Sequence, residues 1–276
     1  MATPRGLEVA HKLGHSVEVL AFTYVPLGGL NLSSAEQKSM KKQLMAVRQS
    51  AVQARIDKFK RPGQKVNLRT VWAKNIDEWI IRRSAKTCEM VIKTGNRSES
   101  LSYTSTDWRL LRECQAPVMI VAEKKWHRTR PVLAALDLAT KVKDKKELNH
   151  KVLATAKLLA EALECELQLI CAIEIPALLA DLDLVEPRAY VKEARAKMQS
   201  NIRALAKAHD LPEKLFRVKK GPVEKVIGSV AAKQRAQLLV MGTVGRKGVK
   251  ARLMGNTAET VLRHLKTDVL ALKLPD

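Results

Sequence analysis

Hydrophobic positions in the second half of the chain fall into short runs separated by longer, one-sided patterns. The runs lack strict apolar–polar alternation, which is typical of parallel strands covered on both faces. Residues 148–163 repeat apolar side chains every three or four positions and predict a helix with one buried face. Residues 187–209 and 222–234 predict two more helices. The predicted strands are Val132–Leu138, Leu167–Ala172 and Leu238–Met241. This order indicates a doubly wound α/β domain.

The chain also repeats itself at an offset of about 150 residues. Ser16–Phe22 superimposes on Glu166–Ala172 at an offset of 150, and Pro117–Val121 superimposes on Asp268–Leu272 at an offset of 151. The repeat unit is therefore a whole domain. Because the linker between the two copies is very short, we expect them to pack tightly.

The first copy lacks a counterpart of the strand at Val132–Leu138. It opens with a helical pattern at Gly6–Leu13 and enters its first strand near Val17. The missing strand is central in a doubly wound sheet, so its loss leaves a gap between its neighbours. Either the chain begins late or another segment fills the gap. We expect two tandem, Rossmann-like, doubly wound parallel-sheet domains, 1–126 and 127–276, the first lacking its first strand.

Composition favours a soluble protein of the reduced cytoplasm. Of the 276 residues, 46% are apolar, which is enough to bury two cores. No run approaches the roughly 20 apolar residues of a membrane-spanning helix, and the first residues contain no apolar signal segment. The four cysteines show neither CxxC pairing nor metal-ligand spacing, so we expect small buried thiols. They are Cys88, Cys114, Cys165 and Cys171.

The formal net charge of +22 is spread over both halves. Such a surface attracts polyanions at low salt. Sequence-specific nucleic-acid binding usually needs aromatic side chains for stacking, and aromatic residues make up 4% of this chain. Two interpretations stay open: a solvated basic surface, and non-specific association with nucleic acid.

A glycine-rich segment follows the strand Leu238–Met241 and leads into a predicted helix. Glycine allows the backbone to approach phosphate oxygens, and Asn256 or Thr257 can cap the helix, whose free N–H groups then face an anion. Asp137 closes the first strand of this half and would meet the segment at the carboxyl edge of the sheet. Without a ligand, the glycines would form a turn and Asp137 a strand-end cap. The three glycines, spaced G-x2-G-x9-G, are Gly242, Gly245 and Gly255.

This spacing resembles the ATP-binding branch of the universal stress protein family, and the resemblance extends over essentially the whole chain. Residues 242–246 with 255–259, and the stretch Tyr-Thr-Ser-Thr-Asp-Trp-Arg-Leu-Leu-Arg at 103–112, are similar to the tandem-domain E type of that family. The resemblance implies an adenine nucleotide alpha hydrolase-like fold. It also implies a cytoplasmic stress-response protein that binds ATP or another adenine nucleotide, with or without Mg²⁺, through its second domain.

The resemblance implies roles for individual residues as well. Asp137 would contact the adenosine or a metal, Ala172 would offer backbone groups to the adenine, and Arg246 would neutralise phosphate or remain solvated. Asn256 stands where the family usually has Ser or Thr, which puts triphosphate binding in question. The predicted nucleotide-binding residues are Asp137, Ala172, Gly242, Thr243, Gly245, Arg246, Gly255, Asn256 and Thr257.

The first domain lacks this glycine spacing in its corresponding loop, 94–107, so we expect no ATP there. In E-type proteins such a half can offer an apolar cavity, which the resemblance suggests for an apolar or lipid-like ligand. We expect Trp108 in the core, and Asp107 can equally cap that helix. The histidines form no catalytic motif and no GxxxxGK[ST] loop is present, so we expect a binding or regulatory protein, at most a weak ATPase. A ligand-free scaffold and self-association are the alternatives.

Overall fold

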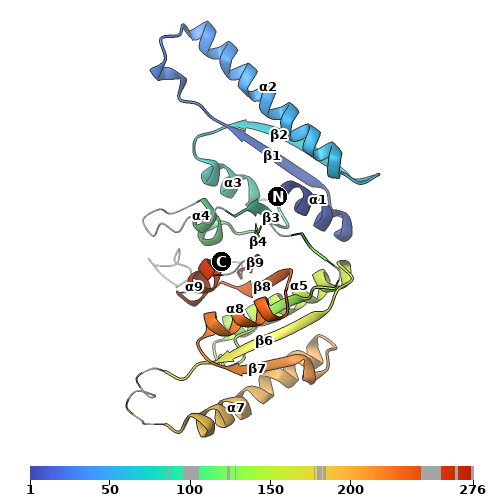
Figure 1. Ribbon diagram of the computed structural model, residues 1–276, viewed down its shortest axis with the longest axis vertical. Coiled ribbons are helices and arrows are strands. Elements are labelled where there is room, and N and C mark those ends of the chain that lie inside the picture. The colour runs from blue at the N-terminus through green and yellow to red at the C-terminus, as the bar shows by residue number, and fades with distance from the viewer. Residues whose placement is uncertain are drawn as a thin grey trace.

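The computed structural model describes residues 1–85, 87–95, 106–122, 125–127, 129–176, 178, 182, 185–243, 256–264 and 267–274. The two halves lie one above the other along the longest axis (Figure 1), the first half in blue and green and the second in yellow to red. Within the described residues, no helix is long and apolar enough to cross a membrane.

The second half contains a five-stranded parallel sheet with the strand order β7-β6-β5-β8-β9. Strand β5 is central, and the chain winds outward from it in both directions, which confirms the predicted doubly wound topology. Its elements are β5 (Val132–Ala135), α5 (Lys143–Ala162), β6 (Leu167–Ile173), α7 (Pro187–Ala208), η2 (Glu213–Leu215), β7 (Phe216–Lys220), α8 (Val223–Lys233), β8 (Leu238–Gly242), α9 (Asn256–His264) and β9 (Asp268–Leu272).

Helices cover both faces of this sheet, as the uninterrupted apolar runs predicted. Helices α5 and α7 pack on one face, where Val152 and Ile202 join the core, while α8 packs on the other through Ile227 and Val230. Helix α5 begins five residues earlier than the apolar pattern predicted, because its first turn is polar and carries no core residue before Leu148.

The first half contains two short parallel pairs instead of one sheet. Strands β1 and β2 form a separate two-stranded sheet, while β3 and β4 belong to the sheet of the second half. Its elements are α1 (Ala2–Leu13), β1 (Val17–Thr23), η1 (Leu27–Gly29), α2 (Ser34–Phe59), β2 (Val66–Trp72), α3 (Ile76–Ser84), β3 (Val91–Thr94), α4 (Thr106–Glu113) and β4 (Val118–Val121). Among the described residues, β1 pairs only with β2 and β3 pairs only with β4, so no strand connects β1 to β3 in space. The described residues of the first half therefore contain no counterpart of β5, the central strand of the second half.

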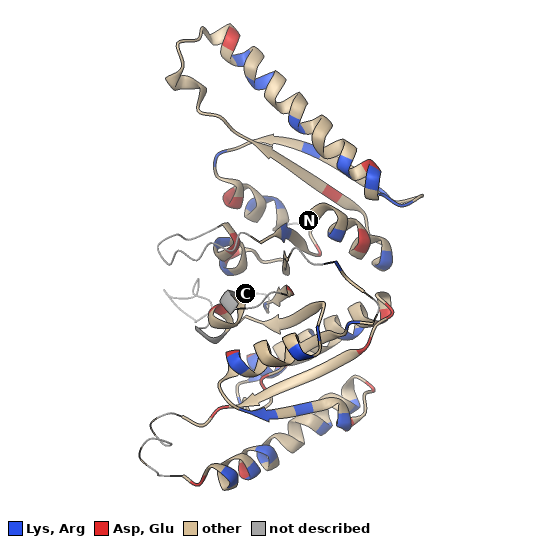
Figure 2. Cartoon of the chain, in the orientation of Figure 1, with Lys and Arg blue, Asp and Glu red and all other residues tan. Residues whose placement is uncertain are grey.

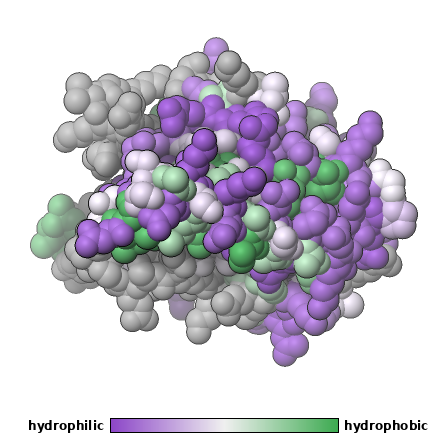
Figure 3. Space-filling model, turned by 90° about the horizontal axis from the view of Figure 1, so that it is seen from above, coloured by the Kyte–Doolittle hydropathy of each residue, from purple (hydrophilic) through white to green (hydrophobic). Residues whose placement is uncertain are grey.

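Helix α2 lies at one end of the molecule (Figure 1) and is largely exposed. Over its 26 residues only Ile56 is buried. Seen from that end, the surface is largely hydrophilic with scattered apolar side chains (Figure 3). Its start is fixed by a capping box, in which the Ser33 hydroxyl accepts from the Glu36 N–H and the Glu36 carboxylate accepts from the Ser33 N–H.

The two halves are joined by an antiparallel pair, β4 with β9, which produces a seven-stranded sheet of order β3-β4-β9-β8-β5-β6-β7. Met119 pairs with Leu270, and these are equivalent positions of the repeat. A local two-fold axis therefore passes between them. This continuous sheet confirms the expectation of tight packing.

A buried ion pair reinforces this junction. Arg5 of α1 donates from Nε to Asp268 Oδ2 at 2.9 Å, and both side chains are buried. Asp268 Oδ1 accepts the Ala122 N–H at 2.7 Å, and the Arg5 guanidinium lies 3.7 Å from the centre of the Trp126 ring. Burial raises the pKa of the Asp268 carboxyl, although Arg5 and the Ala122 N–H oppose that shift. The start of the chain is thus anchored to the second half.

Candidate functional site

The candidate site lies at the carboxyl edge of the second-half sheet. There β5 and β6 end side by side, β8 ends next to β5, and β6 points to the left in Figure 1, toward the side on which α9 lies. Crevices at this edge, where the strand order reverses, are the usual ligand sites of open α/β sheets. Of the predicted residues, Asp137, Ala172, Gly242 and Thr243 lie at these strand ends.

Asp137 follows β5, and its side chain is half exposed with Lys145 Nζ 3.4 Å from Oδ2. Its backbone is held by Asn149 of α5, which accepts the Asp137 N–H at 3.0 Å and donates to the Asp137 carbonyl at 2.8 Å. From α7, Asn201 donates to the Leu138 carbonyl at 2.8 Å. The carboxylate is therefore presented to solvent on a fixed backbone.

Sequence reasoning missed these two asparagines. Asn149 is buried, next to Leu148 on the apolar side of α5. The position of Asn149 beside the apolar stripe of 148–163 could have indicated this role, because a buried side-chain amide needs hydrogen-bond partners. We call the two hydrogen bonds between the Asn149 amide and the Asp137 backbone the Asn149 clamp. Strand β5 ends at Ala135, three residues earlier than predicted, because the clamp bonds the Asp137 backbone to a side chain instead of a neighbouring strand.

On β6, Ala172 is half-buried and pairs with Lys219 of β7. The preceding residue, Cys171, is buried, and burial raises the pKa of its thiol to about 11. It is therefore protonated at neutral pH and does not act as a nucleophile. Cys114 is also buried, while Cys88 and Cys165 are half-buried, and all four thiols are free.

Gly242 and Thr243 end β8 in a tightly packed place. A Cβ at Gly242 would lie 2.5 Å from Leu148 Cδ2, so packing against α5 requires a glycine there. Thr243 is buried, its N–H donates to the Leu272 carbonyl at 2.8 Å, and its hydroxyl bonds to the same oxygen at 3.2 Å. Both residues thus have a structural role, and their contact with a ligand stays a prediction.

The remaining predicted residues are placed less fully. Gly245, Arg246 and Gly255 lie outside the described residues. Asn256 and Thr257 begin α9, as predicted, and their side chains are outside the description. Their roles stay predictions.

The equivalent edge of the first half has different residues. Thr94 stands at the position of Gly242 in the repeat, and its hydroxyl accepts the Ala2 N–H at 2.8 Å. Lys93 Nζ lies 2.6 Å from Asp107 Oδ1. Trp108 packs against the core, as expected, and Asp107 forms this ion pair from inside the first turn of α4. In the first half, a hydrogen bond and an ion pair therefore lie at the end of β3, the position that corresponds to the end of β8 in the second half.

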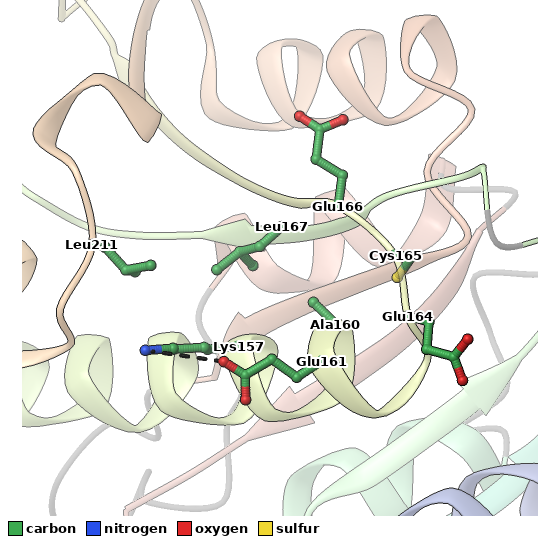
Figure 4. A pocket seen from close by; sticks show the side chains of 8 residues that line it. All are labelled: Lys157, Ala160, Glu161, Glu164, Cys165, Glu166, Leu167 and Leu211. Carbon is green, nitrogen blue, oxygen red and sulfur yellow. Dashed lines mark ion pairs between the residues drawn. The ribbon is translucent and has the colours of Figure 1, made fainter.

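Two surface pockets lie in the second half, away from the predicted site. The first, of about 380 Å³, lies at the amino end of β6, where α5 ends (Figure 4). Glu161, Glu164 and Glu166 make it acidic, and Lys157 lies 4.0 Å from Glu161. Because the three glutamates disfavour phosphate, this pocket does not suit a nucleotide.

The second pocket, of about 350 Å³, is basic and lies between the start of α7 and the end of β7. Lys220 pairs with Ile173, so this pocket adjoins the carboxyl edge next to Ala172. Arg195 donates to the Val218 carbonyl at 2.8 Å. The cations that line it are Arg188, Lys192, Arg195 and Lys220.

No group of three or more His, Cys, Asp or Glu side chains that could hold a metal ion occurs in the part of the chain that is described. Two histidines meet on the surface, with His150 Nδ1 3.0 Å from His209 Nε2. They lie on α5 and just after α7, and neither is near a carboxylate–nucleophile pair among the contacts of the described residues.

The fold is that of a doubly wound α/β protein, built as a tandem repeat. A model of the universal stress protein family matches residues 130–273. The chain is 31% identical over 252 residues to universal stress protein E of Salmonella typhi, which covers 89% of this chain and 80% of that protein. Its homolog in Haemophilus influenzae is 31% identical over 249 residues, covering 88% of this chain and 81% of the homolog. The chain therefore belongs to the universal stress protein family, and it is of the tandem-domain E type.

Solved structures agree on the fold. A functionally unknown protein from Pseudomonas aeruginosa PAO1 superimposes with a TM-score of 0.71 at 23% identity, covering 99% of this chain and 87% of that one. A universal stress protein from Archaeoglobus fulgidus gives a TM-score of 0.61 at 18% identity, covering 99% and 92%. At these identities the likeness concerns the fold.

Proposed function

We propose that the second half binds ATP or another adenine nucleotide at its carboxyl edge, and that the chain is a cytoplasmic stress-response binding protein, not an enzyme. The observation that carries the proposal is the position of Asp137. Its carboxylate stands half exposed beside β6, at the point where the strand order reverses. Such a carboxylate can accept hydrogen bonds from the hydroxyl groups of a ribose.

The neighbouring elements would supply the other contacts. The backbone of β6 at Ala172 would bond to the adenine edge, and the N–H groups at the start of α9 would face the phosphates, because the first N–H groups of a helix lack intrahelical partners. Gly245, Arg246 and Gly255 would complete the site, as the family resemblance implies. Mg²⁺, if bound with the nucleotide, would be held by Asp137 and the phosphates.

Titration calorimetry tests this proposal. ATP should bind the chain with measurable heat at 150 mM salt, and Asp137→Ala should weaken the binding about tenfold or more, a loss of about 1.4 kcal/mol. Glu161→Ala is the matched control, since it removes an exposed carboxylate at the opposite edge of the same sheet. Inorganic tripolyphosphate separates adenosine recognition from attraction to a basic surface.

Equal affinities of ATP and tripolyphosphate would contradict the nucleotide proposal. So would equal losses from Asp137→Ala and Glu161→Ala. No heat at millimolar ATP would remove it altogether.

A second candidate function is polyanion binding at the basic edge formed by α7 and β7. Blue residues crowd both elements in Figure 2, and Lys219 and Lys220 end β7 beside the basic pocket. Binding of a DNA duplex there should weaken steeply with salt, and Lys192→Glu with Lys220→Glu should reduce the slope of log affinity against log salt by about 2. An unchanged slope would exclude this edge.

A further inference from the structure

Two aromatic side chains meet where β1 and β2 end in the first half. Tyr24 follows β1, and Trp72 is the last residue of β2. Their ring centres lie 5.7 Å apart at an interplanar angle of 57°, a favourable contact between aromatic rings. A second ring pair, Phe22 with Trp79, belongs to the same region. Because Tyr24 is 42% exposed, its ring is open to solvent while Trp72 is half-buried beside it.

The repeat shows that the fold does not require aromatic side chains at these strand ends. At the offset of 150, Tyr24 corresponds to Glu174, which is exposed. Strands β2 and β7 are equivalent, and in their registers Trp72 corresponds to Lys220. The ring pair is therefore a feature of the first half and not of the sheet, which calls for an explanation other than packing.

Helix α2 brings positive charge to the rings. Lys41 Nζ lies 5.4 Å from the centre of the Trp72 ring. The helix carries six cations against two carboxylates, Glu36 and Asp57, and blue residues recur along its whole length in Figure 2. Its exposed cations are Lys38, Lys41, Lys42, Arg48, Arg55 and Lys58.

These cations have no carboxylate of their own to neutralise them. None of the ion pairs between described residues involves a cation of α2. The two carboxylates of the helix bond to polar neighbours instead, Glu36 to Ser33 and Asp57 to Gln53. The charge of α2 is therefore available to an external anion.

Rings and cations together fit a single-stranded polynucleotide. Its bases are not covered by a complementary strand, so one of them can stack on an exposed ring while the phosphates meet lysines. An anionic membrane fits less well, because membrane-binding helices present a continuous apolar face. The large apolar side chains exposed on α2 are Val47 and Phe59, which are twelve residues apart.

We propose that the ring platform, meaning Tyr24, Trp72 and Lys41, binds single-stranded nucleic acid in the first half. One base stacks on the Tyr24 ring, Trp72 positions that ring from its buried side, and Lys41 with the other cations of α2 contacts the neighbouring phosphates. The platform is separate from the proposed adenine nucleotide site of the second half and from the basic edge of α7 and β7.

Fluorescence anisotropy with two labelled strands tests the proposal. The probe is oligothymidylate of about ten nucleotides, and the matched control strand has the same length and charge but abasic sugars. At about 50 mM salt the chain should bind the thymidylate about tenfold more tightly than the abasic strand, because only the thymidylate has bases that stack.

Variants locate this preference on the platform. Tyr24→Ala should remove the preference for thymidylate, while Tyr24→Phe should keep it because the ring remains. Phe59→Ala is the matched control, since Phe59 is 40% exposed and has Lys58 Nζ 5.8 Å from its ring centre at the other end of α2. Lys41→Gln should reduce the slope of log affinity against log salt by about 0.7 for both strands, as expected for one lost phosphate contact.

Equal affinities for the two strands would overturn the proposal, and so would a preference that survives Tyr24→Ala or disappears in Phe59→Ala. Loss of the preference in the double variant Lys192→Glu with Lys220→Glu would place the strand at the basic edge of the second half, which also overturns it. Vesicles of phosphatidylglycerol that bind the chain, when the two strands bind equally, would assign the surface to a membrane.

Discussion

Asp268 and Arg5 form the contact that ties the ends of the chain together. Their side chains are 2% and 7% exposed, so each charge is stabilised by its partner and not by hydration. Removing one partner of such a pair leaves an uncompensated buried charge, and that loss exceeds the net value of the pair itself.

Arg5→Met should therefore reduce the free energy of unfolding by about 3–5 kcal/mol, measured by urea denaturation. Lys12→Met is the control, because Lys12 and Glu164 form a pair of 2.6 Å that is largely exposed, and its loss should cost less than about 1 kcal/mol. Adding Asp268→Asn to Arg5→Met should restore part of the loss, since the buried charge is then absent. Equal effects of the two single variants would contradict this account.

His209 and His150 form the clearest titrating contact on the surface. Burial lowers the pKa of His209, and the positive charges of His150 and Lys157 lower it further. The Lys157 ammonium also donates to the His209 carbonyl at 2.8 Å. Because the pKa is lower in the folded state, the stability from neutral His209 is complete above the unfolded value near 6.5 and is lost as pH falls through the folded value.

The melting temperature of the chain should therefore decrease as the pH is lowered from 7.5 to 5.5. The melting temperature of the His209→Gln variant should decrease less over the same range. Differential scanning fluorimetry at four or five pH values measures both slopes. His11→Gln, which removes an exposed histidine of α1, should keep the original slope. If His209→Gln keeps the original slope too, the histidine contact does not control this range.

At the scale of elements, β8 packs closely against α5 where Gly242 meets Leu148. A Cβ at 242 would approach Leu148 Cδ2 to 2.5 Å and Cγ to 2.7 Å, and Leu148 is itself buried. Gly242→Ala should thus cost about 1–3 kcal/mol of unfolding free energy through overpacking.

Chemical denaturation of a variant set measures this cost. Leu148→Ala should partly offset Gly242→Ala in the double variant, because it removes the clashing atoms. Gly228→Ala in α8 is the control, since open space surrounds that position and alanine favours a helix. Additive losses in the double variant would show that Gly242 is not required by packing.

The sequence was informative about these elements where periodicity dominates. Apolar runs located β5, β6 and β8, and the internal repeat pointed to β9 and to the absent central strand, since both depend on local pattern. The largely polar β7 was not located. Contacts that depend on tertiary geometry could not be predicted. The Asn149 clamp, the Leu148 contact and the Arg5–Asp268 pair join residues whose proximity only the folded sheet creates. The antiparallel β4–β9 pairing likewise follows from no local signal in either strand.

At the scale of the whole molecule, the two halves are copies of one repeat unit, but the residues at the carboxyl edges of their strands differ. In the second half, β5 is in place and Asp137 stands at the switch in strand order. In the first half, β1 and β3 remain apart and Lys93 pairs with Asp107. We therefore propose adenine nucleotide binding for the second half alone, where the central strand is present.

Photolabelling with 8-azido-ATP, followed by peptide mapping, tests the central claim most directly. The azide reacts where the adenine lies, so label should appear on peptides of the second half that contain Asp137 or Ala172, and excess ATP should remove it. Label confined to residues 1–122, or label that excess ATP leaves unchanged, would contradict the assignment of the nucleotide site to the second half.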